Sequence, residues 1–478
     1  MDAVRAFIAD PLPYTKGFAP KIPFATQTLL LSVLGLSETS QKWNIRLELT
    51  VKMMRAFVYS PTPSVSAMQN FSLQGFPITR KMWISNVVLR PPVENNICDC
   101  LLKAIEGLKE PDAASGGYKI PEILPVEAEW TGYCGDGISK KGMTEQEKYN
   151  GMMKDAPSQI TILYFHSRAY YLMDPATHRP TVAKLAKYTR GRCISIRYRL
   201  APQNPFPAAL LDGLVAYLNL LHPPPGSFHP PVSASSIVFA GDSSGGNLVL
   251  SLIQTLLEFR RQSLRPTWNG VEISIPLPAG AACNSAWVDI TRSMPSCETN
   301  AKYDYLPTPS THPDGMDFPK CPLWPATPPR KNFFAEDDML CHPLVSPLAV
   351  KDWSGAPPLW VCTGQELLTD EDKHLAAKAA RQGVQVTFEE WEGMPHCFCM
   401  ILMGTKPSRK CFKSWAEFAK LAVKKPQELT TRGVKVSART WKEEMVEVEE
   451  VSKYTDEEVA VRMRHRELRI DYEKGTDA

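Results

Sequence analysis

Short apolar runs alternate with longer amphipathic segments from about residue 158 onward. The apolar runs predict strands, and the amphipathic segments between them predict helices. The predicted strands lie at 160–165, 193–198, 237–240, 359–362 and 384–391, and the predicted helices at 181–188, 208–221, 246–259, 370–382 and 411–421. Because strand and helix alternate, we expect βαβ units that form a mostly parallel sheet flanked by helices.

Three segments depart from this alternation. Residues 1–125 are mostly helical in pattern and predict a helical cap region beside an α/β domain at 126–427. Residues 283–345 are rich in Pro, Trp and Asn, which predicts a long irregular insertion of the kind that forms lids and binding loops. Residues 428–478 are dominated by charged side chains, which predicts a solvated helix or a partly disordered tail.

Composition narrows the class of protein. With 44% hydrophobic and 22% charged residues and a net charge of +3, the chain is typical of a globular protein without affinity for nucleic acid. The sequence shows neither a secretory signal pattern nor an apolar stretch long enough to cross a bilayer, so we expect a cytoplasmic protein. Its twelve cysteines are then free thiols. The pairs at 98/100 and 397/399 have the wrong spacing for a common zinc site, and we expect no metal or cofactor.

The strongest chemical motif is Gly241-x-Ser243-x-Gly245. By itself this pattern is weak, because a glycine-rich turn without chemistry has the same letters. Here an apolar strand enters the motif and an amphipathic helix leaves it, as a nucleophile elbow requires. The motif therefore predicts a reactive Ser243 hydroxyl at a sharp strand-to-helix turn, with the following helix N-terminus directed at developing negative charge.

A reactive serine needs a base, and the base needs an acid that orients it; in α/β-hydrolases both follow the serine in the order acid, then histidine. His396 follows the predicted strand 384–391, where loops gather at the carboxyl edge of the sheet. The other histidines after Ser243 lie in the insertion, in a helix or in the tail. Glu366 is the first carboxylate after the strand 359–362. Asp370 lies four residues later and suits the N-cap of the next helix.

Several motifs together resemble the hormone-sensitive-lipase-like class of α/β-hydrolases, called fold-3 hydrolases, and most closely its fungal carboxylesterase-like members. These motifs are "RYRLAPQNPFPAALLD" (197–212), "GDSSGGN" (241–247), "SAWVDIT" (285–291), "PPLWVCTGQELLTD" (357–370) and "GVQVTFEEWEGMPHCF" (383–398). The resemblance implies Ser243 as nucleophile, His396 as general base and Glu366 as the acid, where the family often has Asp. It also implies a carboxylesterase or lipase-like enzyme that acts on a small apolar ester.

The family's first loop after a strand reads His-Gly-Gly-Gly, and it matches "HSRA" at 166–169 here. The resemblance implies an oxyanion hole formed by the amides of Ser167, Arg168 and Ser244. It also implies further substrate contacts from four residues, His166, Ala169, Tyr170 and Asp242. Since glycine permits backbone angles that a side chain disfavours, we expect Ser167 and Arg168 to hold the loop away from the glycine geometry. The loss of one oxyanion donor costs about 2.7–4 kcal/mol of transition-state stabilisation.

Three functions remain open at this point. The first is a working esterase with an unusual oxyanion hole, in which Arg168 binds a carboxylate of the substrate. The second is a weak or inactive hydrolase that binds a small molecule, and the third is an interaction scaffold that uses the N-terminal helices and the charged tail. The complete set of Ser243, Glu366 and His396 favours the first, since an inactive protein would not need all three residues.

Overall fold

A ten-stranded sheet forms the centre of the computed structural model, which describes residues 28, 36–58, 63–74, 78–110, 117–311 and 318–472. Its strands, in spatial order, are β1 (Met82–Leu89), β2 (Val126–Tyr133), β4 (Arg192–Ile196), β3 (Thr161–Phe165), β5 (Ile237–Asp242), β8 (Gly280–Asn284), β9 (Leu359–Gly364), β10 (Val386–Trp391), β11 (Arg432–Val436) and β12 (Glu443–Val446). The strands from β4 to β11 are parallel, whereas the pairings β1–β2, β2–β4 and β11–β12 at the two edges are antiparallel. The mostly parallel sheet is therefore as the alternation predicted.

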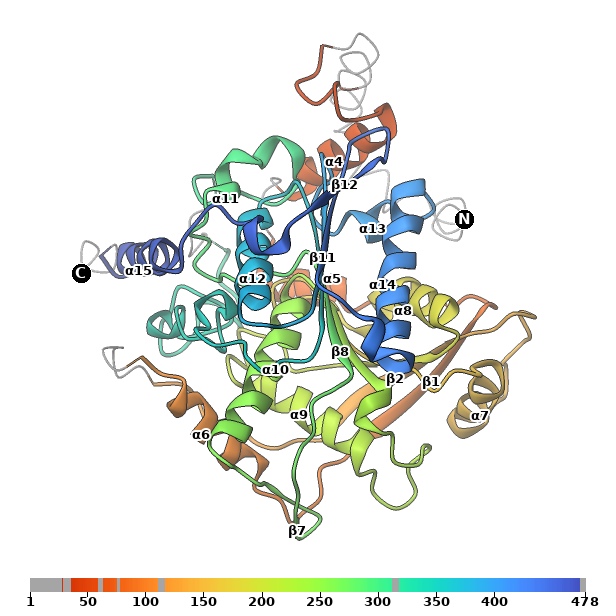
Figure 1. Ribbon diagram of the computed structural model, residues 1–478. Helices are drawn as coiled ribbons and strands as arrows, with labels where there is room; N and C mark the ends of the chain where they lie inside the picture. The colour runs from red at the N-terminus through yellow and green to blue at the C-terminus, as the bar shows by residue number, and fades with distance from the viewer. Residues whose placement is uncertain are drawn as a thin grey trace.

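Helices cover both faces of this sheet (Figure 1). On one face lie α6 (Ile97–Gly107), α9 (Ala208–Leu221), α10 (Ser244–Arg261) and α12 (Thr369–Arg381); on the other lie α8 (Pro175–Thr189), α13 (Phe398–Ile401) and α14 (Lys406–Lys424), with α7 (Glu145–Asp155) beside β1. The central strands are buried along their whole length because helices exclude water from both sides. Alternate residues of β5 accordingly enter two separate cores, Ile237 and Phe239 on the α10 side and Val238 and Ala240 on the α14 side.

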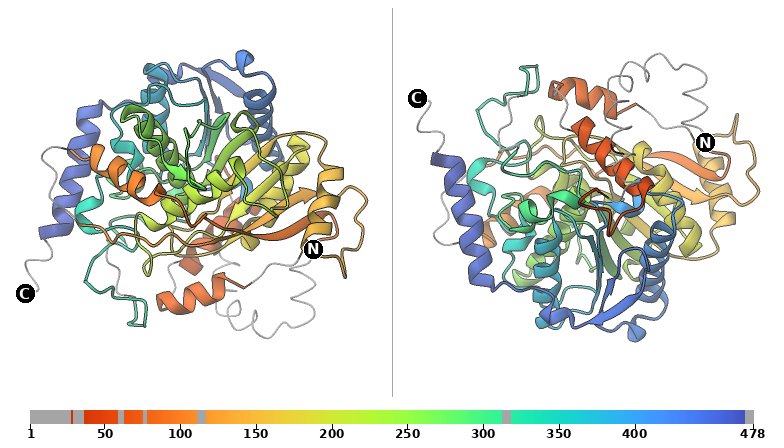
Figure 2. Two further views of the ribbon diagram at one scale, coloured as in Figure 1. Left: turned by 90° about the horizontal axis from the view of Figure 1, so that it is seen from below. Right: turned by 90° about the horizontal axis from the view of Figure 1, so that it is seen from above.

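Smaller elements complete the fold. They are α4 (Ile45–Val58), α5 (Val65–Ser72), α11 (Ser296–Thr299), α15 (Asp456–Tyr472), the hairpin β6 (Thr267–Trp268) with β7 (Val271–Glu272), and the 3₁₀ turns η2 (Ala234–Ser236), η3 (Ala301–Tyr303), η4 (Asp337–Met339), η5 (Pro347–Ala349), η6 (Pro426–Glu428) and η7 (Val448–Glu450). Figure 2 shows α15 along one side of the molecule, far from β1 and β2. In the described part of the chain, no helix combines the length and the apolar character of a membrane span.

Two regions differ from the pattern that the sequence predicted. The first 125 residues are not only helical, because Met82–Leu89 forms β1 and pairs with β2 along its whole length. This antiparallel edge pair has no βα alternation to reveal it. The cap prediction for residues 1–27 and 29–35 lies outside the described residues, so α4 and α5 carry what the structure shows of it.

The charged C-terminal segment also contributes to the sheet. Arg432–Val436 forms β11, which pairs with β10, and Glu443–Val446 forms β12 at the edge. Their exposed side chains include Arg432, Glu443 and Glu444. Charged residues protect an edge strand against association with another chain, and the same charges resemble the composition of a solvated tail. Within residues 428–472, only α15 agrees with the prediction of a solvated helix.

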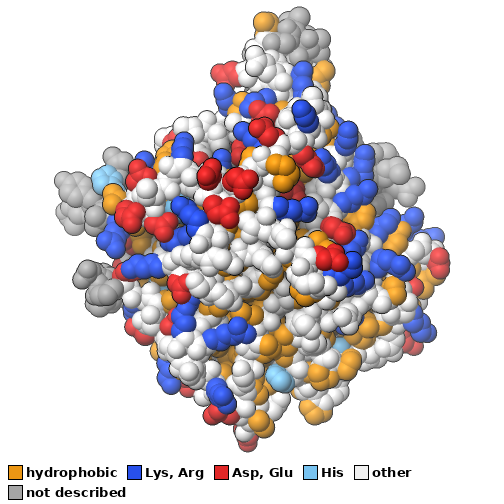
Figure 3. Space-filling model, in the orientation of Figure 1, with side chains coloured by type: hydrophobic (Ala, Val, Ile, Leu, Met, Phe, Trp, Pro, Cys, Tyr) orange, Lys and Arg blue, Asp and Glu red, His pale blue; other side chains and the backbone are white. Residues whose placement is uncertain are grey.

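Charged groups of both signs are spread over the face shown in Figure 3, in keeping with the small net charge. The twelve cysteines are all free, and Cys98, Cys100, Cys397 and Cys399 are buried, as their spacing predicted. The thiols therefore belong to the packed interior.

Candidate active site

Ser243 lies at the turn between β5, which ends at Asp242, and α10, which begins at Ser244. Its backbone has φ 52° and ψ −122°, a strained conformation for a residue with a side chain. The neighbouring chain leaves no room for larger residues: a Cβ on Gly245 would lie 2.1 Å from the carbonyl oxygen of Phe165, and one on Gly241 would lie 2.4 Å from the backbone of Gly245. Glycine is required here by space.

Backbone hydrogen bonds hold this elbow against the end of β8. The Ser243 N–H donates to the carbonyl of Asn284 (3.0 Å), and the Ser243 carbonyl accepts from the N–H groups of Asn247 (3.1 Å) and Trp287 (3.0 Å). The Ser243 hydroxyl makes no hydrogen bond with any residue that the structure describes. The backbone is thus fixed while the hydroxyl is left available.

His396 contacts Glu366 through Nδ1 and Oε2 of the carboxylate. Glu366 follows β9 and His396 follows β10, so the two neighbouring parallel strands deliver them to the same edge of the sheet. The second carboxylate oxygen of Glu366 accepts from Ser285 Oγ (2.5 Å) and from the Gly364 N–H (3.1 Å). The Ser285 hydroxyl in turn accepts from the Cys397 N–H (3.1 Å), and so it links the acid to the histidine loop.

Asp370 does not contact the imidazole. Helix α12 takes Leu368 as its N-cap, and Asp370 lies in the first turn, where its carboxylate accepts from the Ser296 N–H (3.0 Å) and the Tyr454 hydroxyl (3.1 Å). The N-cap assignment of Asp370 is therefore wrong, because the N-cap lies two residues earlier, at Leu368. The choice of Glu366 over Asp370 as the neighbour of His396 agrees with the contact.

A second carboxylate, Asp304, lies beside this pair and was not singled out in the sequence. Its oxygens accept from the N–H groups of Tyr305 (2.7 Å), Leu367 (2.9 Å) and His396 (3.3 Å), and its side chain is buried. Burial and the charge of Glu366 raise the pKa of Asp304. No local signal marks Asp304, since it lies within the proline-rich insertion. Ser285 is also missed by sequence reasoning; the only signal was its place at the start of the "SAWVDIT" motif.

The carboxylates change the ionisation of the histidine. Burial disfavours the charged imidazole, but Glu366, followed by Asp304 and Asp242, outweighs burial and raises the pKa of His396. Asp242 immediately precedes Ser243, and the thiol of Cys397 lies 3.8 Å from its carboxylate. The chain neighbours of Ser243 and of His396 are therefore in contact, which places serine and histidine in one site.

The loop after β3 contradicts one expectation. Arg168, Ala169 and Tyr170 have φ of 83°, 52° and 64°, so three consecutive residues with side chains occupy the left-handed region that glycine prefers. We expected Ser167 and Arg168 to hold the loop away from such angles. They do not, because the side chains of Arg168 and Ala169 are partly exposed and find room at the surface of the site.

The amides of this loop are free to bind a ligand. The N–H groups of Ser167, Arg168 and Ala169 have no hydrogen-bond acceptor among the described residues. The N–H of Ser244 opens helix α10 and has no acceptor within the helix. The loop and the helix N-terminus thus present several unpaired donors on either side of Ser243.

The other residues proposed to touch substrate have structural roles. Tyr170 is buried: its N–H donates to Ser244 Oγ (3.3 Å), its hydroxyl donates to Asn247 (2.7 Å) and its ring stacks on Phe334. These contacts fix the loop to α10. The side chain of Tyr170 consequently faces protein atoms, and the prediction of substrate contact does not fit its position.

His166 and Asp242 are also enclosed. The His166 ring stacks on Tyr198, and burial, followed by His178, lowers the pKa of His166 to about 3. Asp242 accepts from the Tyr164 hydroxyl (2.5 Å) behind the nucleophile. Both side chains are supports of the site rather than parts of its accessible surface. Ala169 alone of the four proposed contacts is partly exposed.

Helix α4 and helix α5 each lie next to a loop of the site, and the right-hand view of Figure 2 looks onto this end of the molecule. Next to α4, Trp43 donates to the carbonyl of Gly393 in the histidine loop (2.5 Å). On α5, Gln69 donates to the carbonyl of Tyr171 (2.9 Å), and the Ser72 hydroxyl accepts from the Met173 N–H (3.0 Å). Both loops of the site are therefore held by the segment that precedes the sheet.

Comparison with known proteins agrees with this architecture. The family model of the alpha/beta hydrolase fold matches residues 162–400. An acetyl-hydrolase of Streptomyces hygroscopicus is 32% identical over 239 residues, which are 49% of this chain and 67% of that protein. An esterase of Acinetobacter venetianus is 29% identical and covers 54% of this chain and 74% of its own length. The chain therefore belongs to the alpha/beta hydrolase fold family.

Solved structures give the same fold. A mutant of the esterase E40 superposes with a TM-score of 0.56 at 22% identity and covers 80% of this chain and 100% of its own. The fold class predicted from the alternation of strands and helices is confirmed.

Proposed function

We propose that this protein hydrolyses carboxylic esters by serine catalysis, with Ser243 as nucleophile, His396 as general base and Glu366 as the acid that orients it. The observation that carries the proposal is the Glu366–His396 pair at the sheet edge where Ser243 occupies its elbow. The names of the acetyl-hydrolase and esterase relatives support the same reaction class. A small, mostly apolar ester is the proposed substrate.

In the first step, Ser243 Oγ attacks the ester carbonyl while His396 Nε2 accepts the hydroxyl proton. The alcohol then leaves with that proton, and an acyl-serine remains. Water, activated by the same imidazole, hydrolyses the acyl-serine and regenerates the enzyme. Glu366 fixes the ring through Nδ1 and stabilises the imidazolium that forms in each step, while Ser285 holds the second oxygen of Glu366.

Negative charge develops on the carbonyl oxygen during both steps. The unpaired N–H groups of Ser167, Arg168 and Ala169 and the N–H of Ser244 are the proposed donors to this oxyanion. The left-handed angles of Arg168 and Ala169, which glycine adopts more readily than other residues, support this assignment. The presence of Ser167, Arg168 and Ala169 where the family has glycines is thus compatible with an active enzyme. This favours hydrolysis over the binding-protein and scaffold alternatives.

A fluorophosphonate probe combined with an ester assay tests the proposal. We expect covalent labelling of the peptide that contains Ser243, turnover of p-nitrophenyl butyrate, and loss of both in Ser243→Ala. Ser263→Ala is a matched control, because Ser263 also has a left-handed backbone (φ 54°) but is exposed and lies outside the site. Equal labelling of the wild type and Ser243→Ala would overturn the mechanism, whereas labelling without turnover would favour a ligand-binding role.

A further inference from the structure

Arg168 differs from other partly enclosed arginines of this protein. Its side chain is only partly exposed, yet it forms no ion pair and no hydrogen bond with any residue that the structure describes. A guanidinium that loses water without gaining a partner costs free energy. The absence of a partner therefore indicates a position left open for a ligand.

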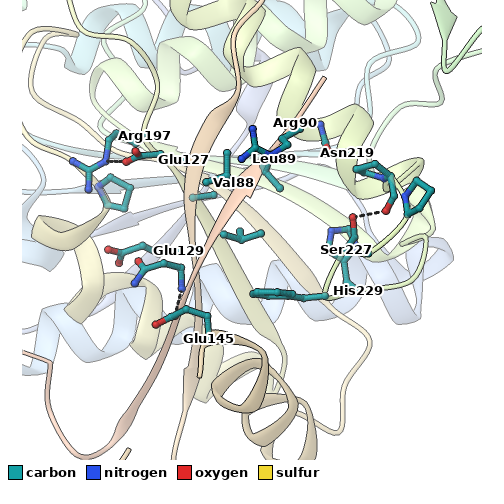
Figure 4. A pocket seen from close by; sticks show the side chains of 18 residues that line it. Val88, Leu89, Arg90, Glu127, Glu129, Glu145, Arg197, Asn219, Ser227 and His229 are labelled. Carbon is teal, nitrogen blue, oxygen red and sulfur yellow. Dashed lines mark hydrogen bonds and ion pairs between the residues drawn. The ribbon is translucent and has the colours of Figure 1, made fainter. Parts of the chain in front are cut away.

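Arg199 shows the usual arrangement, because it is partly enclosed and pairs with Asp212 (2.7 Å). Arg197 is more exposed and is paired as well. It lines a pocket of about 560 Å³ between β1, β2 and the loop at 224–229 (Figure 4), and it pairs with Glu127 (3.1 Å) and with Asp174 (2.8 Å). Glu129 in the same pocket is bound by Arg179. The charges of Arg197 and Glu129 are thus each paired, unlike that of Arg168. Arg90 also lines this pocket, but it is exposed to solvent.

The surroundings of Arg168 place its charge beside the proposed active site. Burial raises the pKa of Tyr305 and of Tyr171, and the positive charge of Arg168 opposes that rise in both. Tyr305 lies against the proposed base, with its ring centroid 6.1 Å from that of His396. The ring of Tyr171 packs against that of Phe333, with 4.7 Å between the ring centroids. The charge of Arg168 therefore acts on a tyrosine that lies against the proposed base and on a tyrosine of its own loop.

The acidic groups nearby are already committed. Glu366 binds His396 and Ser285, Asp304 binds backbone N–H groups, and Asp242 binds Tyr164. None of them contacts Arg168. Because these carboxylates make the interior of the site acidic, an anion from solution would enter unfavourably unless a cation received it.

We propose that Arg168 binds a carboxylate on the substrate, so that the preferred substrates are otherwise apolar esters carrying one negative group. This inference rests on the proposed ester hydrolysis, because the backbone N–H of Arg168 is one of the proposed oxyanion donors. The carboxylate then lies within one arginine side chain of the reacting carbonyl. Arg168 has a left-handed backbone (φ 83°), a strained conformation for a residue with a side chain.

Matched ester pairs test the proposal. On the acyl side, mono-p-nitrophenyl glutarate is compared with p-nitrophenyl valerate; on the alcohol side, p-acetoxybenzoate is compared with its methyl ester. We expect Arg168→Met to lower kcat/KM for the charged member of at least one pair about ten- to hundredfold more than for the neutral member, mainly through KM. Arg168→Lys should retain part of the preference, and added salt should weaken it in the wild type.

Arg190→Met is the matched control, because Arg190 also has a left-handed backbone (φ 56°) and its side chain has no partner among the described residues, but it ends α8 on the exposed surface. It should leave both esters unaffected. An equal loss on charged and neutral esters in Arg168→Met would show that the side chain only supports the loop, and would overturn the proposal. So would a wild-type enzyme without preference for either charged ester.

Binding separates this inference from the mechanism. In the Ser243→Ala background, equilibrium binding of p-acetoxybenzoate and of its methyl ester is measured with Arg168 and with Arg168→Met. Selective loss of the charged ligand supports the anion site even if no ester is hydrolysed, whereas no change refutes it. Failure of hydrolysis and labelling with binding intact would instead refute the proposed function.

Discussion

The nucleophile elbow and the loop after β3 impose the same kind of backbone strain but tolerate different residues. At the elbow, Gly241 and Gly245 lie so close to neighbouring backbone that a Cβ would overlap it. In the loop, Arg168 and Ala169 occupy left-handed angles with their side chains in partly open space. The family pattern has glycine in both regions, but only the elbow lacks the space for a side chain.

The difference separates two reasons for glycine. Lack of space is absolute, because two atoms cannot occupy one position, whereas a left-handed angle costs a residue with a side chain only about 1–2 kcal/mol. The loop of this protein accepts that cost, and contacts such as that of the Tyr170 hydroxyl with Asn247 hold it in place. A loop of this kind is free to carry a functional side chain, which is the role inferred for Arg168.

The largest expected effect is on the chemistry that the elbow presents. Ser243→Ala and His396→Ala should each lower turnover of a neutral ester about a thousandfold or more, and the double variant should be no worse, because the two residues act as one unit. Single-turnover kinetics with p-nitrophenyl butyrate measure this. Additive losses in the double variant would contradict a shared mechanism.

Next in size is the effect of removing the charge of Glu366. Glu366→Gln should lower kcat a hundredfold or more, because the imidazolium loses its counter-charge. The carboxylates raise the pKa of His396, and the base must be neutral, so activity is lost as pH falls through that raised pKa. Removing the charge lowers the pKa, and the acid limb of the kcat/KM profile should move to lower pH.

Asp304→Asn should move that limb in the same direction by less, since Asp304 does not contact the imidazole ring. A limb that moves to higher pH in either variant would contradict the electrostatic account.

Gly245→Ala breaks the elbow directly. Overlap of the new methyl group with the Phe165 carbonyl should lower the free energy of unfolding by about 1–3 kcal/mol and reduce labelling of Ser243. Chemical denaturation and the fluorophosphonate assay measure the two effects. Gly135→Ala is the control, since a Cβ at Gly135 meets nothing within 4 Å, and it should change neither.

The smallest expected effect comes from the loop. Ala169→Gly removes left-handed strain of about 1–2 kcal/mol and adds a backbone entropy cost of about 0.5–1 kcal/mol, so stability should rise by up to about 1.5 kcal/mol. Turnover of neutral esters should change less than about tenfold, because the amides are already unpaired and in place. Ala183→Gly within α8 should instead lower stability. A large gain in turnover would show that the loop limits catalysis after all.

The sequence by itself determined the parts that depend on neighbouring residues. Hydrophobic periodicity acts over a few residues, and it predicted α9 with its observed bounds and the turn that carries Ser243. It also favoured Glu366 over Asp370, since a residue at the end of a buried strand faces the edge where the loops meet. The edge strands β1, β11 and β12 escaped it, because their pairing is distant and their exposed side chains follow solvent rather than a core.

Only the tertiary structure decided which distant groups share the site. Asp304 and Ser285 reach the Glu366–His396 pair from the segment between β8 and β9, through hydrogen bonds that join residues far apart in the chain. The angles of the loop at Arg168 likewise depend on Tyr170, which is held by α10 and Phe334. The residues of the loop by themselves favoured a conformation away from left-handed angles. Packing selected left-handed angles instead, because contacts made across the fold outweigh a local backbone preference of about 1–2 kcal/mol per residue.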